Sequence, residues 1–489
     1  MTSEIRTDMI RQLTDLALRY GRKQQSAQTR FVHYFHHANE GEAHETIPLV
    51  ENALFALALF HNRTSESVVE GKEVIDRLLH FQNTEGNFPL YLHEYPQGRD
   101  RFIGAHLLPP LYWILKSFHT VLGSELRQRL EAAVSRLLVY VLNMHAEHPA
   151  PYYLAIRIAA SAKAFGDFFK DSFLQEQGTT LLEKLQQQNA FDVWCSPGHI
   201  ADLLVALQMI YPNLSNSPWQ HFWKHLQKTW HSPTMSYAGP ALREYQCGAA
   251  LQTTLYDLFM GYYGGTLSPR ALQESPVHLH AALIRPSTDQ LTANTLPYQS
   301  QGEVRGLRWV MQQTPTHAWN VIERQGIVNP ATENGVHLLR MTWGLANTFV
   351  CQGGTSKVVS HHVHAEGIDL VFEFSDAAPS EEREKDREIA FYFNTQPNVR
   401  FLVNSIPATT FKLNEPVQVH ADGLALQISC TLESGEGTFL GHFMRGNRPS
   451  QLALKGEKRF QAYDWQVILR TLRRDEQCRI KVALRFLNV

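Results

Sequence analysis

The stretch SYAGPALREYQCGAALQTTLYDLFMGYYGG, residues 236–265, separates two halves of the chain that differ in their hydrophobic patterning. Upstream of it, apolar residues recur at spacings of three and four, which is typical of amphipathic helices. Downstream of it, short runs rich in Val, Ile, Phe and Thr alternate with turn residues, which is typical of strands. This order predicts a helical domain over residues 1–265 and a strand-rich domain over residues 266–489.

The same stretch holds the densest group of reactive side chains in the sequence, Tyr237, Arg243, Glu244 and Tyr245. Proline disfavours helix at the residue before it, so Gly239-Pro240 predicts a loop that precedes the helix expected from residue 251. On an extended loop, residues two apart point the same way, and the Arg243 guanidinium would lower the pKa of the Tyr245 phenol from about 10. The alternative is that both side chains fill an ordinary seam between domains, with Glu244 as a salt-bridge partner of Arg243.

The upstream half contains about ten helical segments. They are expected at residues 5–20, 47–60, 68–81, 107–122, 126–144, 152–165, 171–188, 200–211 and 219–230, followed by the helix after residue 251. No strict repeat of 34 to 40 residues is present, which excludes a tetratricopeptide or HEAT array. Two long loops, 82–106 and 189–199, mix Gly, Pro, aromatic and polar residues, and such loops are where binding groups tend to lie.

The downstream half has its clearest signal at residues 367–374, where Ile368, Leu370, Phe372 and Phe374 alternate with Asp369, Val371 and Glu373. This period of two indicates a half-buried strand. Further strands are expected at residues 279–284, 319–322, 336–343, 348–351, 389–393, 399–403, 417–420, 424–432, 438–444, 465–472 and 480–486. A dozen short strands with turn signals between them predict an antiparallel β-sandwich.

Composition excludes several classes of function. The formal net charge is −2, from 45 basic and 47 acidic residues, so no broad basic field is available for nucleic acid. The sequence contains no run of about 18 successive apolar residues, which a membrane-spanning helix would require. Phosphate-binding loops, GxSxG elbows and HExxH motifs are absent from the sequence, which removes kinase, serine-hydrolase and zincin interpretations.

The start of the chain is a charged amphipathic segment without the apolar core of a signal peptide. The five cysteines are odd in number and scattered, which is typical of free thiols in a reducing compartment. We therefore expect a cytoplasmic protein.

A large helical half followed by a β-sandwich resembles the polysaccharide lyases built from an (α/α) toroid and a β-sandwich, and most of all the heparinase II/III-like group. The matching pieces are Arg243 and Tyr245, the loop WCSPGH at 194–199, and SHHVH at 360–364. In that family the toroid supplies a tyrosine and an Asn or His, and the sandwich supplies a histidine. This chain departs from the family in lacking a signal peptide and in reading HPAPYY at 148–153, where the family often has an Asn before an aromatic residue.

The resemblance implies a toroid of about ten helices and β-elimination of a uronate-containing poly- or oligosaccharide in the cleft between the domains. Such elimination requires a group that neutralises the sugar carboxylate, a base for the C5 proton and an acid for the departing O4. The expected catalytic residues are Tyr245, Arg243, His199 and His362. The residues expected to bind substrate are Asn87, Arg101, His106, Tyr153, Trp194, Tyr237, Glu244 and His364.

Each of these assignments has an alternative. His199 follows Ser196-Pro197-Gly198 and could simply belong to a capped helix start. On a strand, His362 and His364 share a face opposite to His361 and could ligate one metal ion, although zinc needs further ligands and we expect no cofactor.

Two other functions stay open. The first is a glycoside hydrolase, which requires two carboxyl groups; candidates on the loops are Glu85, Glu94, Asp100, Asp192 and Glu244. The second is a non-enzymatic scaffold that binds a glycan or a protein. The expected partner is an acidic poly- or oligosaccharide, with neither nucleic acid nor membrane.

Overall fold

The computed structural model describes residues 3–39, 42–188, 196–240, 253–304, 307–323, 339–345, 347–351, 357–364, 366–374, 389–394, 399–445 and 465–488. These residues form two compact units. The first contains the described residues up to Leu226 together with Thr253–Thr292, and the second contains the described residues of 227–240 and those from Ala293 onward. The bounds 1–265 and 266–489 drawn from the sequence stay a prediction.

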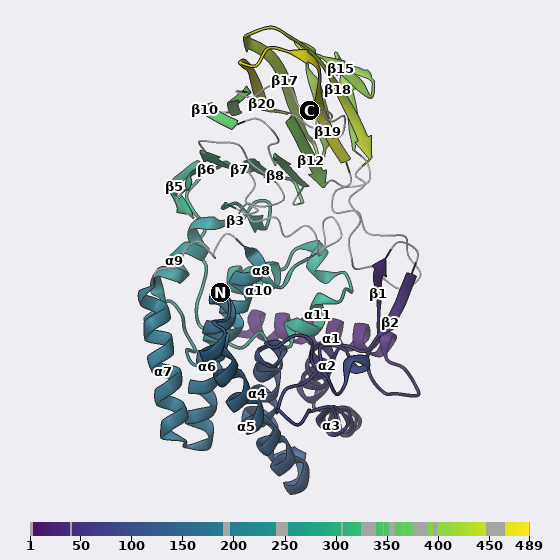
Figure 1. Cartoon of the computed structure of the whole chain (residues 1–489), viewed down its shortest axis with the longest axis vertical. Helices are drawn as coiled ribbons and strands as arrows, with labels where there is room; N and C mark the ends of the chain where they lie inside the picture. The colour runs from purple at the N-terminus through teal and green to yellow at the C-terminus, as the bar shows by residue number, and fades with distance from the viewer. Residues whose placement is uncertain are drawn as a thin grey trace. The chain divides into compact units, whose positions relative to one another are not determined.

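The first unit is helical (Figure 1). Its helices are α1 (Ser3–Gln24), α2 (Leu49–Asn62), α3 (Ser65–Leu79), α4 (Ile103–Leu122), α5 (Ser124–Glu147), α6 (Tyr152–Phe169), α7 (Ser172–Gln187), α8 (Pro197–Gln208), α9 (Gln220–Thr229, which ends in the second unit), α10 (Leu255–Gly264) and α11 (Val277–Ala281). A hairpin of β1 (Tyr34–Asn39) and β2 (Glu42–Thr46) lies between α1 and α2.

Helices in this unit alternate between two layers. Helices α2, α4, α6 and α8 are buried on almost every side, as expected for helices that are apolar all round. Helices α3, α5 and α7 are amphipathic and bury a single face. Helices α2, α4 and α6 each pack against the amphipathic helix that follows and against the next buried helix. This double layer confirms the predicted (α/α) toroid of about ten helices.

All four buried helices run in the same direction. Short links join α2 to α3, α4 to α5 and α6 to α7, so each amphipathic helix returns antiparallel to its partner. The contacts of Arg157 with His106 and Asp202 join residues near the starts of α4, α6 and α8, so these helices start at the same end. As a result, the N-terminal ends of α2, α4, α6 and α8 gather at one end of the layer and their C-terminal ends gather at the other.

The first unit corrects three expectations. Residues 279–284, expected as a strand, belong to α11 and the turn after it, because a short apolar run does not distinguish a strand from a buried helix. Helix α4 starts at Ile103, so His106 lies on a helix rather than on the preceding loop. Likewise His199 lies in the first turn of α8. None of the helices in the described ranges is long and apolar enough to cross a membrane.

The second unit is a sandwich of two antiparallel sheets, as predicted. One sheet has nine strands in the order β15-β18-β19-β12-β9-β8-β7-β6-β5, and the other has seven in the order β10-β11-β20-β17-β16-β13-β14. The strands are β5 (Tyr298–Val304), β6 (Leu307–Gln313), β7 (His317–Glu323), β8 (Leu339–Trp343), β9 (Asn347–Cys351), β10 (Lys357–His364), β11 (Gly367–Phe374), β12 (Ile389–Asn394), β13 (Arg400–Val403), β14 (Ile406–Pro407), β15 (Thr410–Lys412), β16 (Val417–Ala421), β17 (Leu424–Ser434), β18 (Gly437–Arg445), β19 (Trp465–Arg474) and β20 (Cys478–Asn488). A small pair, β3 (Trp230–His231) and β4 (Ser236–Tyr237), also belongs to this unit.

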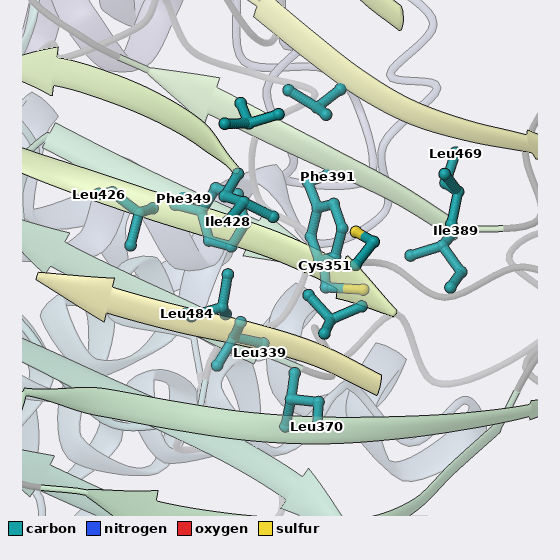
Figure 2. Packing of buried hydrophobic residues seen from close by; sticks show 14 of the residues in the cluster. Leu339, Phe349, Cys351, Leu370, Ile389, Phe391, Leu426, Ile428, Leu469 and Leu484 are labelled. Atoms are coloured by element: carbon teal, nitrogen blue, oxygen red, sulfur yellow. The ribbon is translucent and has the colours of Figure 1, made fainter. Parts of the chain in front are cut away.

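The core of the sandwich is formed by the facing sides of its sheets. Figure 2 shows Leu339, Phe349 and Phe391 from the nine-stranded sheet packed with Leu370 and Leu484 from the seven-stranded sheet. The alternation predicted for β11 is confirmed, because its four even-numbered apolar residues are fully buried in this core. Each fully buried side chain of this size contributes about 1.5–3 kcal/mol of transfer free energy. The odd-numbered residues of β11 therefore lie on the opposite face, which carries its charged groups.

Candidate active site

Polar side chains gather at the N-terminal ends of the buried helices. We call this group the N-terminal cluster; it consists of Glu51 on α2, His106 on α4, Tyr153 and Arg157 on α6, His199 and Asp202 on α8, and His280 on α11. Except for His280, these residues lie in the first two turns of helices that are otherwise almost entirely apolar. Helix N-terminal ends carry positive partial charge and unpaired N–H groups, so this end of the layer favours a negatively charged ligand.

Arg157 is the centre of the cluster, with a side chain that is 5% exposed. Its Nη1 donates to Nδ1 of His106 at 2.6 Å, and its Nη2 donates to the Asp202 carboxylate. Burial, with the charge of Arg157 and then His280, holds the pKa of His106 well below its usual range. His106 is therefore neutral, and because its Nδ1 accepts from Arg157, its proton must be on Nε2. This leaves a half-buried imidazole with an N–H donor on the side away from Arg157.

The surroundings of Asp202 disfavour its charged form, although Arg157 is its ion-pair partner. Burial raises the pKa of its carboxyl group, and the opposing effects of Arg157 and His199 do not cancel this rise. The side chain is nevertheless 23% exposed, so the pair has one side open to solvent.

Tyr153 and His199 form a stacked pair whose ring centroids lie 3.9 Å apart, with planes 11° from parallel. The backbone N–H of His199 donates to Ser196 Oγ at 3.1 Å, so the capped helix start considered from the sequence is confirmed. Burial raises the pKa of Tyr153, the charge of Asp202 adds to this rise and Arg157 opposes it. Tyr153 therefore keeps its proton at neutral pH and is a hydrogen-bond donor in this state.

Glu51 and His280 complete the cluster. The Glu51 Oε1 atom lies 3.9 Å from His280 Nε2, and both side chains are partly exposed. Burial raises the pKa of Glu51 to about 7. Burial, followed by the charge of Arg157, lowers the pKa of His280 to about 4. At neutral pH, His280 is uncharged and Glu51 is protonated about half of the time.

The sequence singled out only part of this cluster. His106, Tyr153 and His199 were predicted and lie together, whereas Glu51, Arg157, Asp202 and His280 were missed. Their signal was a charged or polar residue near the start of an apolar helix, such as Glu51 in IPLVENALFALALF.

Of the other predicted residues in the first unit, Asn87 is 1% exposed and its Nδ2 donates to the Asp100 carbonyl oxygen at 3.2 Å. Arg101 is exposed on the same loop. Trp194, Arg243, Glu244 and Tyr245 lie outside the described residues, so their roles stay predictions.

Three predicted residues belong to the second unit. Tyr237 is buried, its hydroxyl donates to the Pro240 carbonyl oxygen at 2.9 Å, and Arg340 lies 5.9 Å from its ring centroid. His362 and His364 share a face of β10, as expected, with ring centroids 4.7 Å apart. Their catalytic and binding roles remain predictions, and across the described ranges no three His, Cys, Asp or Glu side chains gather to hold a metal ion.

His364 also contacts a charged group on β11 and β20. Its Nε2 lies 3.1 Å from Asp369 Oδ2, and Asp369 further accepts from Lys481 Nζ at 2.8 Å and from Arg485. Burial alone would raise the pKa of Asp369, but the hydrogen bonds from Lys481, Arg485 and His364 outweigh it and hold that pKa at about 2.

Comparison with known proteins identifies similar folds and no similar sequences. No protein-family model matches the chain, and no curated protein sequence matches it. The chondroitin AC lyase of Streptomyces coelicolor A3, solved in complex with chondroitin sulphate, is 10% identical with a TM-score of 0.54, over 98% of this chain and 79% of that one.

Two further solved structures are less similar. A heparinase III is 10% identical over 89% of this chain and 76% of that one, with a TM-score of 0.40. A heparan sulfate lyase HepC mutant from Pedobacter heparinus is 8% identical over 90% and 77%, with a TM-score of 0.33. At such identities the comparison with the chondroitin lyase concerns the fold alone. It confirms the resemblance in fold to the lyases built from a helical toroid and a β-sandwich.

Proposed function

We propose that this chain is a carbohydrate-active enzyme that cleaves a uronate-containing poly- or oligosaccharide by β-elimination, with the acidic sugar bound at the N-terminal cluster. The observation that carries this proposal is the contact between Arg157 and His106, because it leaves His106 with an outward Nε2–H donor. The fold shared with the chondroitin lyase makes elimination the first reaction to test.

The cluster supplies the neutralisation that elimination requires. The sugar carboxylate would accept hydrogen bonds from His106 Nε2, from the Tyr153 hydroxyl and from protonated Glu51. Arg157 adds a fixed positive charge behind these donors, and four helix N-terminal ends add partial charges worth about 0.3–1 kcal/mol each. Neutralising the carboxylate stabilises the negative charge that develops when the C5 proton leaves.

The proton transfers are assigned from the sequence, because Arg243 and Tyr245 lie outside the described residues. Tyr245, activated by Arg243, takes the C5 proton, and the C–H electron pair forms the C4–C5 double bond as the bond from C4 to O4 breaks. His199 gives a proton to the departing O4, and Tyr153 holds the His199 ring in place by stacking. The products are a new chain end at O4 and an unsaturated uronate.

The first experiment incubates the protein with chondroitin sulphate, heparan sulfate and other uronate polymers while ultraviolet absorbance is recorded. Elimination predicts growing absorbance from the unsaturated uronate. The Tyr245→Phe variant should lose this signal, and Arg157→Gln should reduce kcat/KM by about 10²–10³, as the removal of one stabilising donor typically does.

Arg127→Gln, which changes a surface arginine paired with Glu131 on α5, is the matched control and should keep full activity. If Arg157→Gln fails to fold, Arg157→Lys retains the charge while losing the fork geometry and should show a smaller loss. If both Arg157 variants were as active as the wild type, the proposal would be contradicted.

A glycoside hydrolase is the second candidate, and Glu51 favours it. Hydrolysis needs a carboxyl group that is protonated near neutral pH, and burial raises the pKa of Glu51 to about 7. New reducing ends without ultraviolet absorbance, lost in Glu51→Gln, would establish hydrolysis in place of elimination.

A further inference from the structure

A pocket of about 1000 Å³ lies at the opposite ends of the same buried helices. It is formed by α1, the C-terminal ends of α2 and α8, the second half of α4, and residues 284–286 after α11. Because the N-terminal cluster occupies the other ends of α2, α4 and α8, this pocket is a separate place within the first unit. We call it the Arg285 pocket, after the cation on its wall.

Arg285 is fixed in the wall by three contacts. Its Nη1 donates to Nε2 of His61 at 2.6 Å, its Nη2 donates to the Ala282 carbonyl oxygen, and its guanidinium carbon lies 4.6 Å from the centroid of the Trp113 ring. A guanidinium has five N–H donors, so these hydrogen bonds engage only part of its capacity. Within the described part of the chain, no carboxylate forms an ion pair with Arg285.

The neighbours of Arg285 do not balance its charge. Burial, then Arg285 and Arg63, hold the pKa of His61 well below its usual range, so His61 accepts a hydrogen bond as a neutral ring. The Trp113 ring face attracts the cation but carries no net charge. The C-terminal ends of α2 and α8 bring partial negative charge, which is less than a full counter-ion.

Two buried donors in this wall also lack hydrogen-bond acceptors. They are Nε of Arg285 and Nε1 of Trp113. Burial lowers the pKa of Arg285 to about 9, which is the expected effect on a cation placed among neutral groups. The wall therefore carries a positive charge that none of the contacts of Arg285 offsets, and an oxyanion is the ligand that complements it.

The remaining lining favours an organic anion over a bare ion. Arg63 and Lys116 add positive charge, whereas Asp15 and Asp167 add negative charge, and all four are exposed at the pocket. Aromatic side chains, including Tyr112 and Tyr211, line it as well and suit a ring-shaped ligand. We propose that the Arg285 pocket binds a small organic oxyanion, a carboxylate or phosphate on a sugar-sized ring, with Arg285 as its counter-charge. This site goes beyond the proposed elimination and does not depend on it.

Calorimetric titration tests the site with three probes: glucuronate, glucose 6-phosphate and neutral glucose. We expect saturable binding of at least one of the two anions that is weakened in Arg285→Gln and kept in Arg157→Gln, and no binding of glucose. The anion that shows this pattern distinguishes a carboxylate ligand from a phosphate ligand. Arg285→Gln should weaken this binding at least tenfold, because the charge that selects the anion is removed. Arg127→Gln, on the surface of α5, should bind as the wild type does.

A second variant protects the test against loss of folding in Arg285→Gln. Lys116 is exposed, so Lys116→Gln should fold and weaken anion binding severalfold through the lost charge. The proposal is overturned if neither anion binds at millimolar concentrations, or if folded Arg285→Gln binds the anion as tightly as the wild type. Elimination activity is not needed for either readout, so this site and the proposed function can fail separately.

Discussion

Two carboxyl groups, Glu51 in the helical unit and Asp369 in the sandwich, have opposite surroundings. Asp369 accepts from Lys481 and Arg485 and lies against His364, and its pKa is held at about 2. Glu51 has His280, uncharged at neutral pH, 3.9 Å away, and burial raises its pKa to about 7. The cations around Asp369 give its carboxylate a structural role. A carboxyl group whose pKa is raised toward 7 on a partly open surface, like that of Glu51, is instead available to bind a ligand or to transfer a proton.

Substitution of Arg157, in the same cluster as Glu51, should cause the greatest loss of stability. Arg157→Met leaves the Asp202 carboxyl without its cation, and removing one partner of a buried pair typically costs about 3–5 kcal/mol. Because Asp202 is 23% exposed, we expect the lower end of that range. Hydrogen exchange of α6 and α8 measures the loss within the helical unit. An unchanged exchange rate would show that the pair does not hold these helices together.

Glu51→Gln should increase the stability of the fold at alkaline pH, whereas Arg157→Met should decrease it. The pKa of Glu51 is raised in the folded state, so its contribution to stability is fully present below the unfolded pKa of about 4.5 and is lost as pH rises through about 7. Replacing it by neutral Gln should stabilise the helical unit by about 2–3 kcal/mol at pH 8 and change little at pH 4. Thermal unfolding at both pH values tests this, and equal stability of the two proteins at pH 8 would contradict the raised pKa.

The same titration should govern activity if protonated Glu51 contacts the sugar carboxylate. Wild-type kcat/KM should then fall about tenfold for each pH unit above 7, whereas Glu51→Gln should remove this step from the pH profile because the amide cannot ionise. The pKa of Glu51 is about 7, so wild-type kcat/KM that stays constant from about pH 6 to about pH 9 would exclude this role for Glu51.

The stabilisation by Asp369 depends on pH in the opposite direction to that of Glu51. Its folded pKa is depressed, so its stabilisation is present above the unfolded pKa of about 3.8 and is lost as pH falls through about 2. Asp369→Asn should cost about 2 kcal/mol at neutral pH and almost nothing near pH 2. Chemical unfolding of the sandwich gives both values, and a cost that persists at pH 2 would indicate lost packing in place of lost charge.

The smallest expected effect is at His364. Lys481 and Arg485 continue to bind Asp369 when His364 is replaced by Gln, so the loss should be below about 1 kcal/mol. A larger loss in chemical unfolding would mean that His364 is more than a third partner of an already paired carboxylate.

The sequence predicted the elements more fully than the site because elements depend on local patterns. The alternation in β11 and the apolar segment of α2 are each visible within a dozen residues. The prediction of a strand at residues 279–284 was wrong because a short apolar pattern suits a strand and a buried helix equally. By contrast, Arg157 meets His106 across 51 positions and Asp202 across 45. These contacts arise from the parallel arrangement of α4, α6 and α8, which no local pattern encodes.

The central claim, that the N-terminal cluster holds an acidic sugar, is tested most directly by the affinity for a chondroitin tetrasaccharide of the wild type, Arg157→Gln and the Arg127→Gln control. The account predicts binding that weakens as salt concentration rises, at least tenfold weaker binding in Arg157→Gln, and wild-type affinity in the control. Equal affinity of the folded Arg157→Gln variant and the wild type would contradict the account and place the sugar elsewhere on the chain.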